Sequence, residues 1–169
     1  AMTSLLVELY DRHVLEKNVY QAYISNSDEL LFLSLDKIDD DEKFSLRQFI
    51  LDQVAHVQRV TFRQVSLEQL EAQLDFSLPN YDQVLLDVFG GDSLLAISLY
   101  QYGLSRNLPI VAMDIEKCKQ YKWQAGRLLK EDLDIPTLTI QELIALRGGK
   151  LLKSKRPIFS KQKIVAIKK

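Results

Sequence analysis

Two short polar segments carry the groups in this sequence that are best suited to binding a ligand. The first, Tyr10-Asp11-Arg12-His13, follows an apolar run and supplies a guanidinium group and an imidazole. The second, Phe89-Gly90-Gly91-Asp92-Ser93, supplies a diglycine turn and a hydroxyl. Glycines at a turn let a ligand approach the backbone, and the free N–H groups at the start of a helix attract anions. Together the two segments would suit a polyanion.

Plainer interpretations of the same residues stay open. A glycine pair suits any tight turn between a strand and a helix, and Arg12 and His13 equally suit a solvated loop. Asp92 is best placed to cap the following helix, where its carboxylate occupies N–H groups and repels phosphate. Ser93 suits an ordinary first-turn position. The spacing matches neither the GxGxxG pattern of dinucleotide-binding folds nor the GxxxxGK[ST] pattern of P-loops.

The sequence offers little for catalysis. One cysteine, Cys118, and two histidines, His13 and His56, argue against a cysteine- or histidine-based metal site. No serine lies in a GxSxG motif, and the acidic run at 36–42 is expected to be a solvated loop rather than part of a metal-dependent nuclease. We therefore assign no catalytic residue, no metal and no cofactor.

The polar segments follow elements of an alternating β and α pattern. Apolar runs predict strands at 5–10, 29–34, 57–65, 84–89 and 108–113, the third of them at an edge. Apolar residues at helical spacing predict helices at 14–26 and 41–56, a short third helix that Ser66 and Gln69 cap and that ends near Leu74, and a fourth from Ser93 onward. Such alternation favours a parallel sheet with helices on both faces. Ligands bind such sheets at the carboxyl ends of strands, here the first and fourth.

The pattern changes after Asp114. A sixth strand, antiparallel to its neighbour, is predicted at 119–124, and Thr139 is expected to cap a last helix at 140–146 that Gly148-Gly149 ends. The predicted fold is therefore α/β and Rossmann-like: a mostly parallel six-stranded sheet with helices on both faces, spanning residues 3–149.

Charge divides the chain into two parts. Of 169 residues, 22 are basic and 23 acidic, but the segment from Lys150 to Lys169 holds eight basic residues and no acidic one. We interpret 150–169 as a linker or the start of a truncated effector domain, with nucleic-acid binding as the alternative. No apolar run is long enough for a membrane span and no signal peptide is recognisable, so together with the single cysteine the sequence predicts a cytoplasmic protein.

Four pieces of the sequence, the first of them made of two segments, resemble the CARF domains of CRISPR-associated proteins, most closely those joined to a nuclease and activated by cyclic oligoadenylate. Residues 5–11 and 15–19 are similar to the family's first strand and first helix, and 30–33 to its second strand. Residues 86–96 lie where the family has Asn-Leu-Thr-Gly-Gly-Thr-Lys-Leu-Met, and 139–148 resemble its closing helix. The diglycine and the closing helix are the more specific of the four.

The resemblance implies a sensing domain of a type III CRISPR nuclease effector. It implies a homodimer whose diglycine loops surround one two-fold axis and bind cyclic tetra- or hexa-adenylate. The residues implied to line the pocket are Asp11, Arg12, His13, Gly90, Gly91, Asp92 and Ser93. The family's Thr-Lys after the glycines is replaced here by Asp92-Ser93, which leaves Arg12 to supply the missing positive charge.

Three other functions remain open at this point. The chain could be a ring nuclease that cleaves cyclic oligoadenylate without a metal, because aligning a 2′-hydroxyl with its phosphate needs few side chains. It could bind nucleic acid through 150–169, in which case binding falls steeply with salt. It could also be a dimerisation module that binds no ligand.

Overall fold

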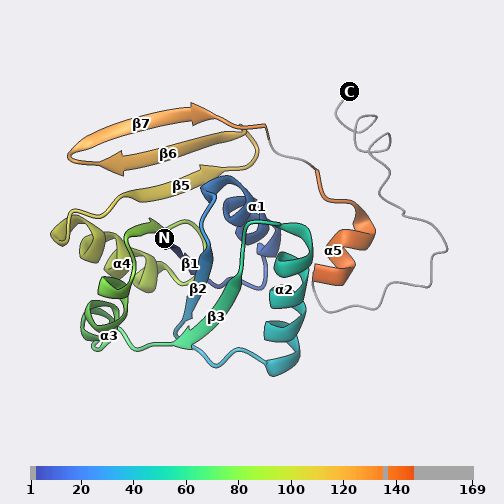
Figure 1. Cartoon of the computed structure of the whole chain (residues 1–169), viewed down its shortest axis with the longest axis horizontal. Coiled ribbons are helices and arrows are strands. Elements are labelled where there is room, and N and C mark those ends of the chain that lie inside the picture. The colour runs from blue at the N-terminus through green and yellow to red at the C-terminus, as the bar shows by residue number, and fades with distance from the viewer. Residues whose placement is uncertain (1–2, 135–136, 147–169) are drawn as a thin grey trace.

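A single mixed sheet forms the centre of the protein in this computed structural model, which describes residues 3–134 and 137–146 (Figure 1). The elements in chain order are β1 (Ser4–Leu9), α1 (Leu15–Ser25), β2 (Glu29–Ser34), α2 (Asp40–Gln53), β3 (Arg59–Gln64), α3 (Leu70–Ser77), a 3₁₀ turn (Leu78–Asn80), β4 (Gln83–Asp87), α4 (Ser93–Ser105), β5 (Ile110–Asp114), β6 (Lys119–Gln124), β7 (Arg127–Asp132) and α5 (Ile140–Leu146). The Rossmann-like α/β prediction is confirmed.

The sheet has seven strands in the order β3-β2-β1-β4-β5-β6-β7. The first five strands of the chain pair in parallel, and β6 and β7 pair antiparallel. Strand order reverses between β1 and β4, which are direct neighbours. The prediction that their carboxyl ends lie together is therefore correct, and it places the two polar segments at one edge of the sheet.

The predicted count of six strands is wrong, because it omitted β7. All six residues of β7 are exposed, so the strand lacks the apolar face by which a strand is recognised in a sequence. Backbone pairing with β6 holds it, through a tight turn at Ala125 and Gly126, whose φ angles of 51° and 75° suit a two-residue hairpin loop.

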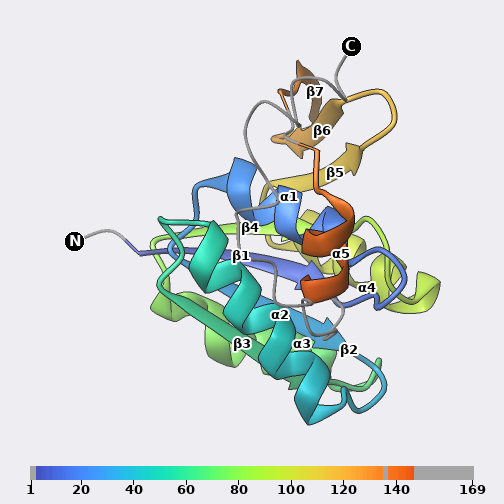
Figure 2. The same ribbon diagram turned by 90° about the vertical axis from the view of Figure 1, so that its right-hand side faces the viewer.

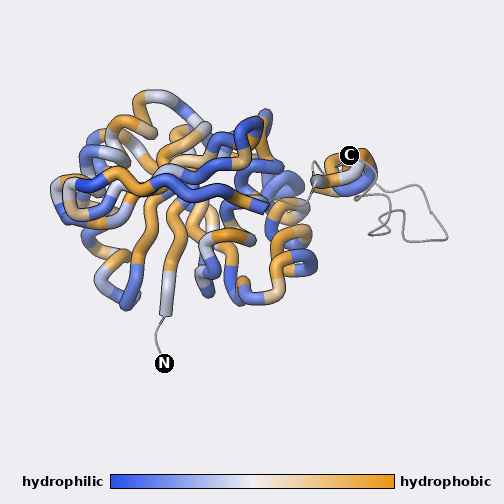
Figure 3. Tube along the Cα trace, turned by 90° about the horizontal axis from the view of Figure 1, so that it is seen from above, coloured by the Kyte–Doolittle hydropathy of each residue, from blue (hydrophilic) through white to orange (hydrophobic). Residues whose placement is uncertain are grey.

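Helices cover the two faces of the sheet in separate groups. Figure 2 shows α1, α2 and α5 together on one side, with α3 and α4 on the other. Along β1 the side chains alternate between the two layers: Leu5, Val7 and Leu9 pack with α3 and α4, whereas Leu6 packs with α1 and α2. Figure 3 shows the hydrophobic residues concentrated along the central strands.

The two predicted helix caps have different outcomes. Thr139 and Glu142 form a reciprocal capping box at the start of α5, as predicted for Thr139: each backbone N–H donates to the other's side chain, at 2.9 and 3.2 Å. At α3 the prediction is wrong. Ser66 Oγ accepts a hydrogen bond from the Gln69 N–H, but this closes a turn, and α3 itself begins at Leu70 and continues to Ser77.

Two other predictions fall on residues outside the described ranges. These are the termination of α5 by Gly148-Gly149 and the role of the basic segment 150–169. In the described ranges, no helix combines the length and apolar character that crossing a bilayer requires. The same ranges contain no cluster of three histidine, cysteine or acidic side chains arranged to hold a metal ion.

Candidate functional site

A cleft of about 420 Å³ opens at the carboxyl ends of β1, β2 and β4. Three loops form it, one after each of these strands, together with the first turns of α2 and α4. The residues that line it are Tyr10, Asp11, Arg12, His13, Ser34, Leu35, Asp36, Lys37, Ile38, Glu42, Gly91, Asp92 and Leu95.

The structure brings together five of the seven residues predicted for the site. Asp11, Arg12, His13, Gly91 and Asp92 line the cleft, whereas Gly90 and Ser93 belong to the same loop but not to the cleft wall. The loop after β2, at 34–38, and Glu42 of α2 also line the cleft and were not predicted from the sequence. The signal was available, because the second of several parallel strands ends at the same edge as the first.

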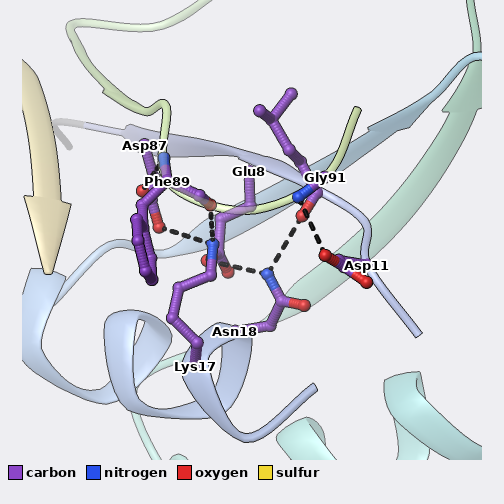
Figure 4. Close-up of polar contacts among 8 residues, drawn as sticks. Glu8, Asp11, Lys17, Asn18, Asp87, Phe89 and Gly91 are labelled. Carbon is purple, nitrogen blue, oxygen red and sulfur yellow. Dashed lines mark hydrogen bonds and ion pairs between the residues drawn. The ribbon is translucent and has the colours of Figure 1, made fainter. Parts of the chain in front are cut away.

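Asp11 joins the two predicted segments. One carboxylate oxygen accepts a hydrogen bond from the Gly91 N–H at 3.1 Å (Figure 4). The other oxygen accepts from the His13 N–H at 2.9 Å. Because the carboxylate bridges loops 80 residues apart in the chain, its first role is to hold the cleft together.

Asp92 is the N-cap of α4, as its position predicted. Its Oδ1 accepts hydrogen bonds from the Leu94 and Leu95 N–H groups at 2.9 and 3.2 Å. Asp11 and Asp92 together therefore accept hydrogen bonds from three backbone N–H groups of this loop and helix start, those of Gly91, Leu94 and Leu95.

Arg12 extends from the β1 loop across to α2. Its guanidinium lies 3.4 Å from Glu42 Oε1, and the other oxygen of Glu42 accepts a hydrogen bond from the Tyr10 hydroxyl at 3.0 Å. Burial, reinforced by this carboxylate, raises the pKa of Tyr10 above its ordinary value. The Arg12 side chain remains 67% exposed, so water weakens this ion pair and an incoming anion can compete for the arginine.

The diglycine turn is required by its surroundings. Gly90 and Gly91 have φ angles of 86° and 71°, which side chains adopt only with strain. A Cβ on Gly91 would lie 2.7 Å from Leu9 Cβ, closer than two such atoms approach. The turn therefore packs directly against the end of β1.

Alanine at Gly91 is expected to destabilise the fold more than alanine at Gly126. Both glycines have φ above 70°, but a Cβ on Gly126 meets no atom within 4 Å. Gly126→Ala should therefore cost only the backbone strain, about 1–2 kcal/mol, and Gly91→Ala about 1–3 kcal/mol more for overpacking. Urea denaturation of both variants measures the difference, and equal losses would show that the turn can move away from Leu9.

Beneath this turn lies a network of buried ionisable groups on the α1 side of the sheet (Figure 4). Glu8 of β1, Lys17 and Asn18 of α1 and Asp87 of β4 are all fully buried. Lys17 Nζ lies 3.2 Å from Asp87 Oδ2 and 3.8 Å from Glu8 Oε1, and Asn18 Nδ2 donates to Glu8 Oε1 at 3.1 Å. This network was not predicted from the sequence, although Glu8 and Asp87, as charged residues inside strands predicted to be buried, were a usable signal.

Charge balance in this network favours a proton on Glu8. Two carboxylates face one ammonium, and burial raises the pKa of Glu8 well above its ordinary range, while Lys17 acts in the opposite direction and Asp87 raises it further. The folded state therefore holds a proton that the unfolded chain releases at about pH 4.3.

Stability is accordingly expected to fall as the pH rises from about 4.3 towards the folded pKa of Glu8, by up to about 1.4 kcal/mol per pH unit. The sign follows from the raised pKa, because the folded state binds more protons than the unfolded state in this window. Glu8→Gln copies the protonated form and should remove this part of the slope. Denaturation of both proteins over a series of pH values measures it, and identical slopes would mean that Glu8 ionises normally.

A second surface feature adjoins the cleft. None of the 13 residues of α4 is charged, and three large apolar side chains on one face are exposed: Leu94 at 59%, Ile97 at 57% and Leu104 at 55%. Positions three and seven residues apart lie on one side of a helix, so these three form a stripe that begins at the cleft. A helix with such an uncharged, apolar outer face is typical of an interaction surface.

Comparison with known proteins gives matches in structure but not in sequence. No protein-family profile matches the sequence, and no curated protein is similar enough in sequence to be matched. Among solved structures, Can2 from Sulfobacillus thermosulfidooxidans in complex with cyclic tetra-adenylate matches with a TM-score of 0.65 and 19% identity over 85% of this chain. VC1899 from Vibrio cholerae matches with a TM-score of 0.65 and 10% identity over 85% of this chain.

A third solved structure is Csm6 from Enterococcus italicus bound to cyclic hexa-2′-fluoro-hexa-dAMP, with a TM-score of 0.53 and 8% identity over 68% of this chain. The chain spans 40% of the Can2 chain, 39% of the VC1899 chain and 34% of the Csm6 chain. Can2 and Csm6 are CARF-domain proteins, so the predicted resemblance is confirmed at the level of the fold: this chain has the CARF domain fold.

Proposed function

We propose that this chain is a sensing domain of a CRISPR-associated effector, which binds a cyclic oligoadenylate at the axis of a homodimer. One observation carries the proposal: the diglycine turn and the β1 loop meet at the switch point of a CARF fold and form an open cleft there. Two of the structures with this fold hold a cyclic adenylate ligand. We propose cyclic tetra- or hexa-adenylate as the ligand here.

The charges around the cleft determine where the phosphates of a ligand can bind. Four carboxylates line it, on Asp11, Asp36, Glu42 and Asp92, against the permanent cations of Arg12 and Lys37. A phosphate is attracted only where the positive charge of these cations locally exceeds the negative charge of the carboxylates. The Arg12 side chain is 67% exposed and its partner Glu42 is 29% exposed, so the guanidinium is accessible to the ligand. We propose that Arg12 leaves Glu42 for the ligand, at little cost for so exposed an ion pair.

The apolar stripe on α4 supports the dimeric part of the proposal. A two-fold interface places the same patch on both partners, so an uncharged apolar face is complementary to itself. The stripe starts at Leu94, next to Asp92 and Leu95 at the cleft, so a two-fold axis beside α4 would bring two clefts together. A cyclic ligand of matching symmetry would then meet each cleft residue twice.

The test is thermal unfolding with and without cyclic tetra- and hexa-adenylate at two salt concentrations. A ligand at about a hundred times its dissociation constant stabilises the folded state by about 2.7 kcal/mol, which is seen as a raised Tm. A shift with one ring size supports the proposal. The absence of a shift with either ring overturns it, and analysis of the recovered ligand shows in the same samples whether the chain cleaves the ring.

Two substitutions are expected to change affinity in opposite directions. Arg12→Ala removes the cation and should weaken binding about 10- to 100-fold, the usual range for a lost hydrogen bond to a charged group. Asp92→Asn keeps the helix cap but removes the negative charge, and should tighten binding about 2- to 5-fold. Calorimetric titration measures both, and weaker binding by Asp92→Asn would mean that the carboxylate itself contacts the ligand.

A further inference from the structure

Lys17, the buried lysine beneath the diglycine turn, binds a backbone carbonyl in addition to the carboxylates that balance its charge. In addition to the two carboxylates, Lys17 Nζ donates a hydrogen bond to the backbone carbonyl of Phe89, in the loop that enters α4 (Figure 4). The ammonium thus joins α1, β1, β4 and the site loop at one point.

We propose that Lys17 is a positioning residue for the ligand site, which turns the Phe89–Gly90 peptide so that its N–H points away from the buried network, open to a phosphate beside the cleft wall that Gly91 and Asp92 form. The inference rests on the proposed function, because it names how that function's loop is held ready. Lys17 itself does not touch the ligand in this proposal, since its side chain is fully buried.

Peptide geometry supplies the first step of the argument. The carbonyl of Phe89 and the N–H of Gly90 belong to one peptide unit, and all peptide bonds of the described residues are trans. In a trans peptide these two groups point in opposite directions. A carbonyl bound inward by Lys17 therefore directs the Gly90 N–H away from the network.

The neighbouring amides explain why this one is available. The N–H groups of Phe89, Gly91, Leu94 and Leu95 already donate to the carboxylates of Asp87, Asp11 and Asp92. Within the described ranges, the Gly90 N–H has no such acceptor. An anion at this loop would find the Gly90 amide open, whereas it would have to displace a carboxylate from the four amides just named.

The packing of the turn makes the lysine hard to replace. A Cβ on Gly90 would lie 3.4 Å from both Cε and Nζ of Lys17, so the backbone of the turn rests on the end of the lysine side chain. The Phe89 ring lies over the same ammonium, 5.7 Å from its centroid to Nζ. A side chain without a donor at this point would leave the partly buried Phe89 carbonyl without its partner, and the peptide would be free to rotate.

The experiment separates this role from charge balance with a pair of variants. Lys17→Met/Asp87→Asn removes one charge of each sign and leaves a balanced interior, while Asp87→Asn alone retains the lysine and its bond to Phe89. Lys130→Met, on the exposed strand β7, is the control for the same change of residue type. Binding of cyclic tetra- and hexa-adenylate is measured by calorimetry, and the Gly90 amide by NMR shift and hydrogen exchange.

We expect the double variant to fold, to bind at least 10-fold more weakly than Asp87→Asn, and to show a moved Gly90 amide resonance. Lys130→Met should match the wild type in all three readouts. Equal affinity and an unmoved Gly90 resonance in the double variant overturn the inference. If the wild type binds neither ring, the proposed function fails, and the Gly90 resonance in the absence of ligand still decides whether Lys17 orients the peptide.

Discussion

Replacing Lys17 alone by methionine is expected to lower the free energy of unfolding by about 3–5 kcal/mol, the usual cost of removing one partner of a buried ion pair. Methionine has a similar length and shape, so the loss reports charge and hydrogen bonding rather than a cavity. Glu8 and Asp87 would then remain fully buried with no cation between them. The Phe89 carbonyl would also lose its donor.

Urea denaturation at neutral pH measures this loss directly. Adding Asp87→Asn to Lys17→Met removes the uncompensated charge and should recover at least half of the lost stability. Lys130→Met should change stability by no more than about 0.5 kcal/mol, as is usual for an exposed site. A loss of less than about 1 kcal/mol for Lys17→Met would mean that the two carboxylates take up protons without cost, or that water reaches them.

The elements that sequence could predict are those whose burial shows in the residue pattern. β2 was placed at its observed bounds, because its residues 30–33 are continuously apolar and polar residues flank them. β6 and α5 were also placed correctly, the latter from the Thr139 cap. The pairing of β1 with β4 followed from topology, because alternating strands and helices admit few sheet orders.

The elements that sequence missed are held by interactions that leave no such pattern. β7 is a fully exposed strand that depends on backbone pairing with its neighbour. The start of α3 was misplaced because Ser66 makes the hydrogen bond expected of a cap while the chain closes a turn first. A donor and an acceptor at the right spacing fit both outcomes, and only tertiary packing distinguishes them.

The candidate site likewise contains residues that the sequence could predict and residues that it could not. The two convergent loops could be predicted, because each follows a recognisable strand. The network of Glu8, Lys17 and Asp87 could not be assembled, because these residues lie in three elements and only the fold shows that they face one another. The lysine that bonds the carbonyl just before the diglycine turn thus comes from α1 and lies 72 positions away from Phe89 in the sequence.

Aspartate in place of Ile97 is expected to convert the proposed homodimer into a monomer. Ile97 lies between Leu94 and Leu104 on the apolar face of α4, which contains no charge that could pair with a new carboxylate. In a two-fold interface each substitution occurs twice, and an unpaired charge costs several kcal/mol to bury. Dimer affinity should therefore fall by about three orders of magnitude or more. Because Ile97 is already more than half exposed, the folded monomer should lose little stability.

Sedimentation over a range of protein concentrations measures the change, with Phe44→Asp as the matched control. Phe44 is also a large exposed apolar residue, but it lies on α2, on the opposite face of the sheet. A wild type that is monomeric throughout, or an Ile97→Asp variant that stays dimeric, would contradict an interface on α4.

The same variant, Ile97→Asp, also tests where the ligand binds. If the ring lies across the two-fold axis, Ile97→Asp should lose the thermal shift with cyclic adenylate, because a lone protomer offers only half of the contacts. A monomer that keeps the full shift would instead place the whole ligand within one cleft.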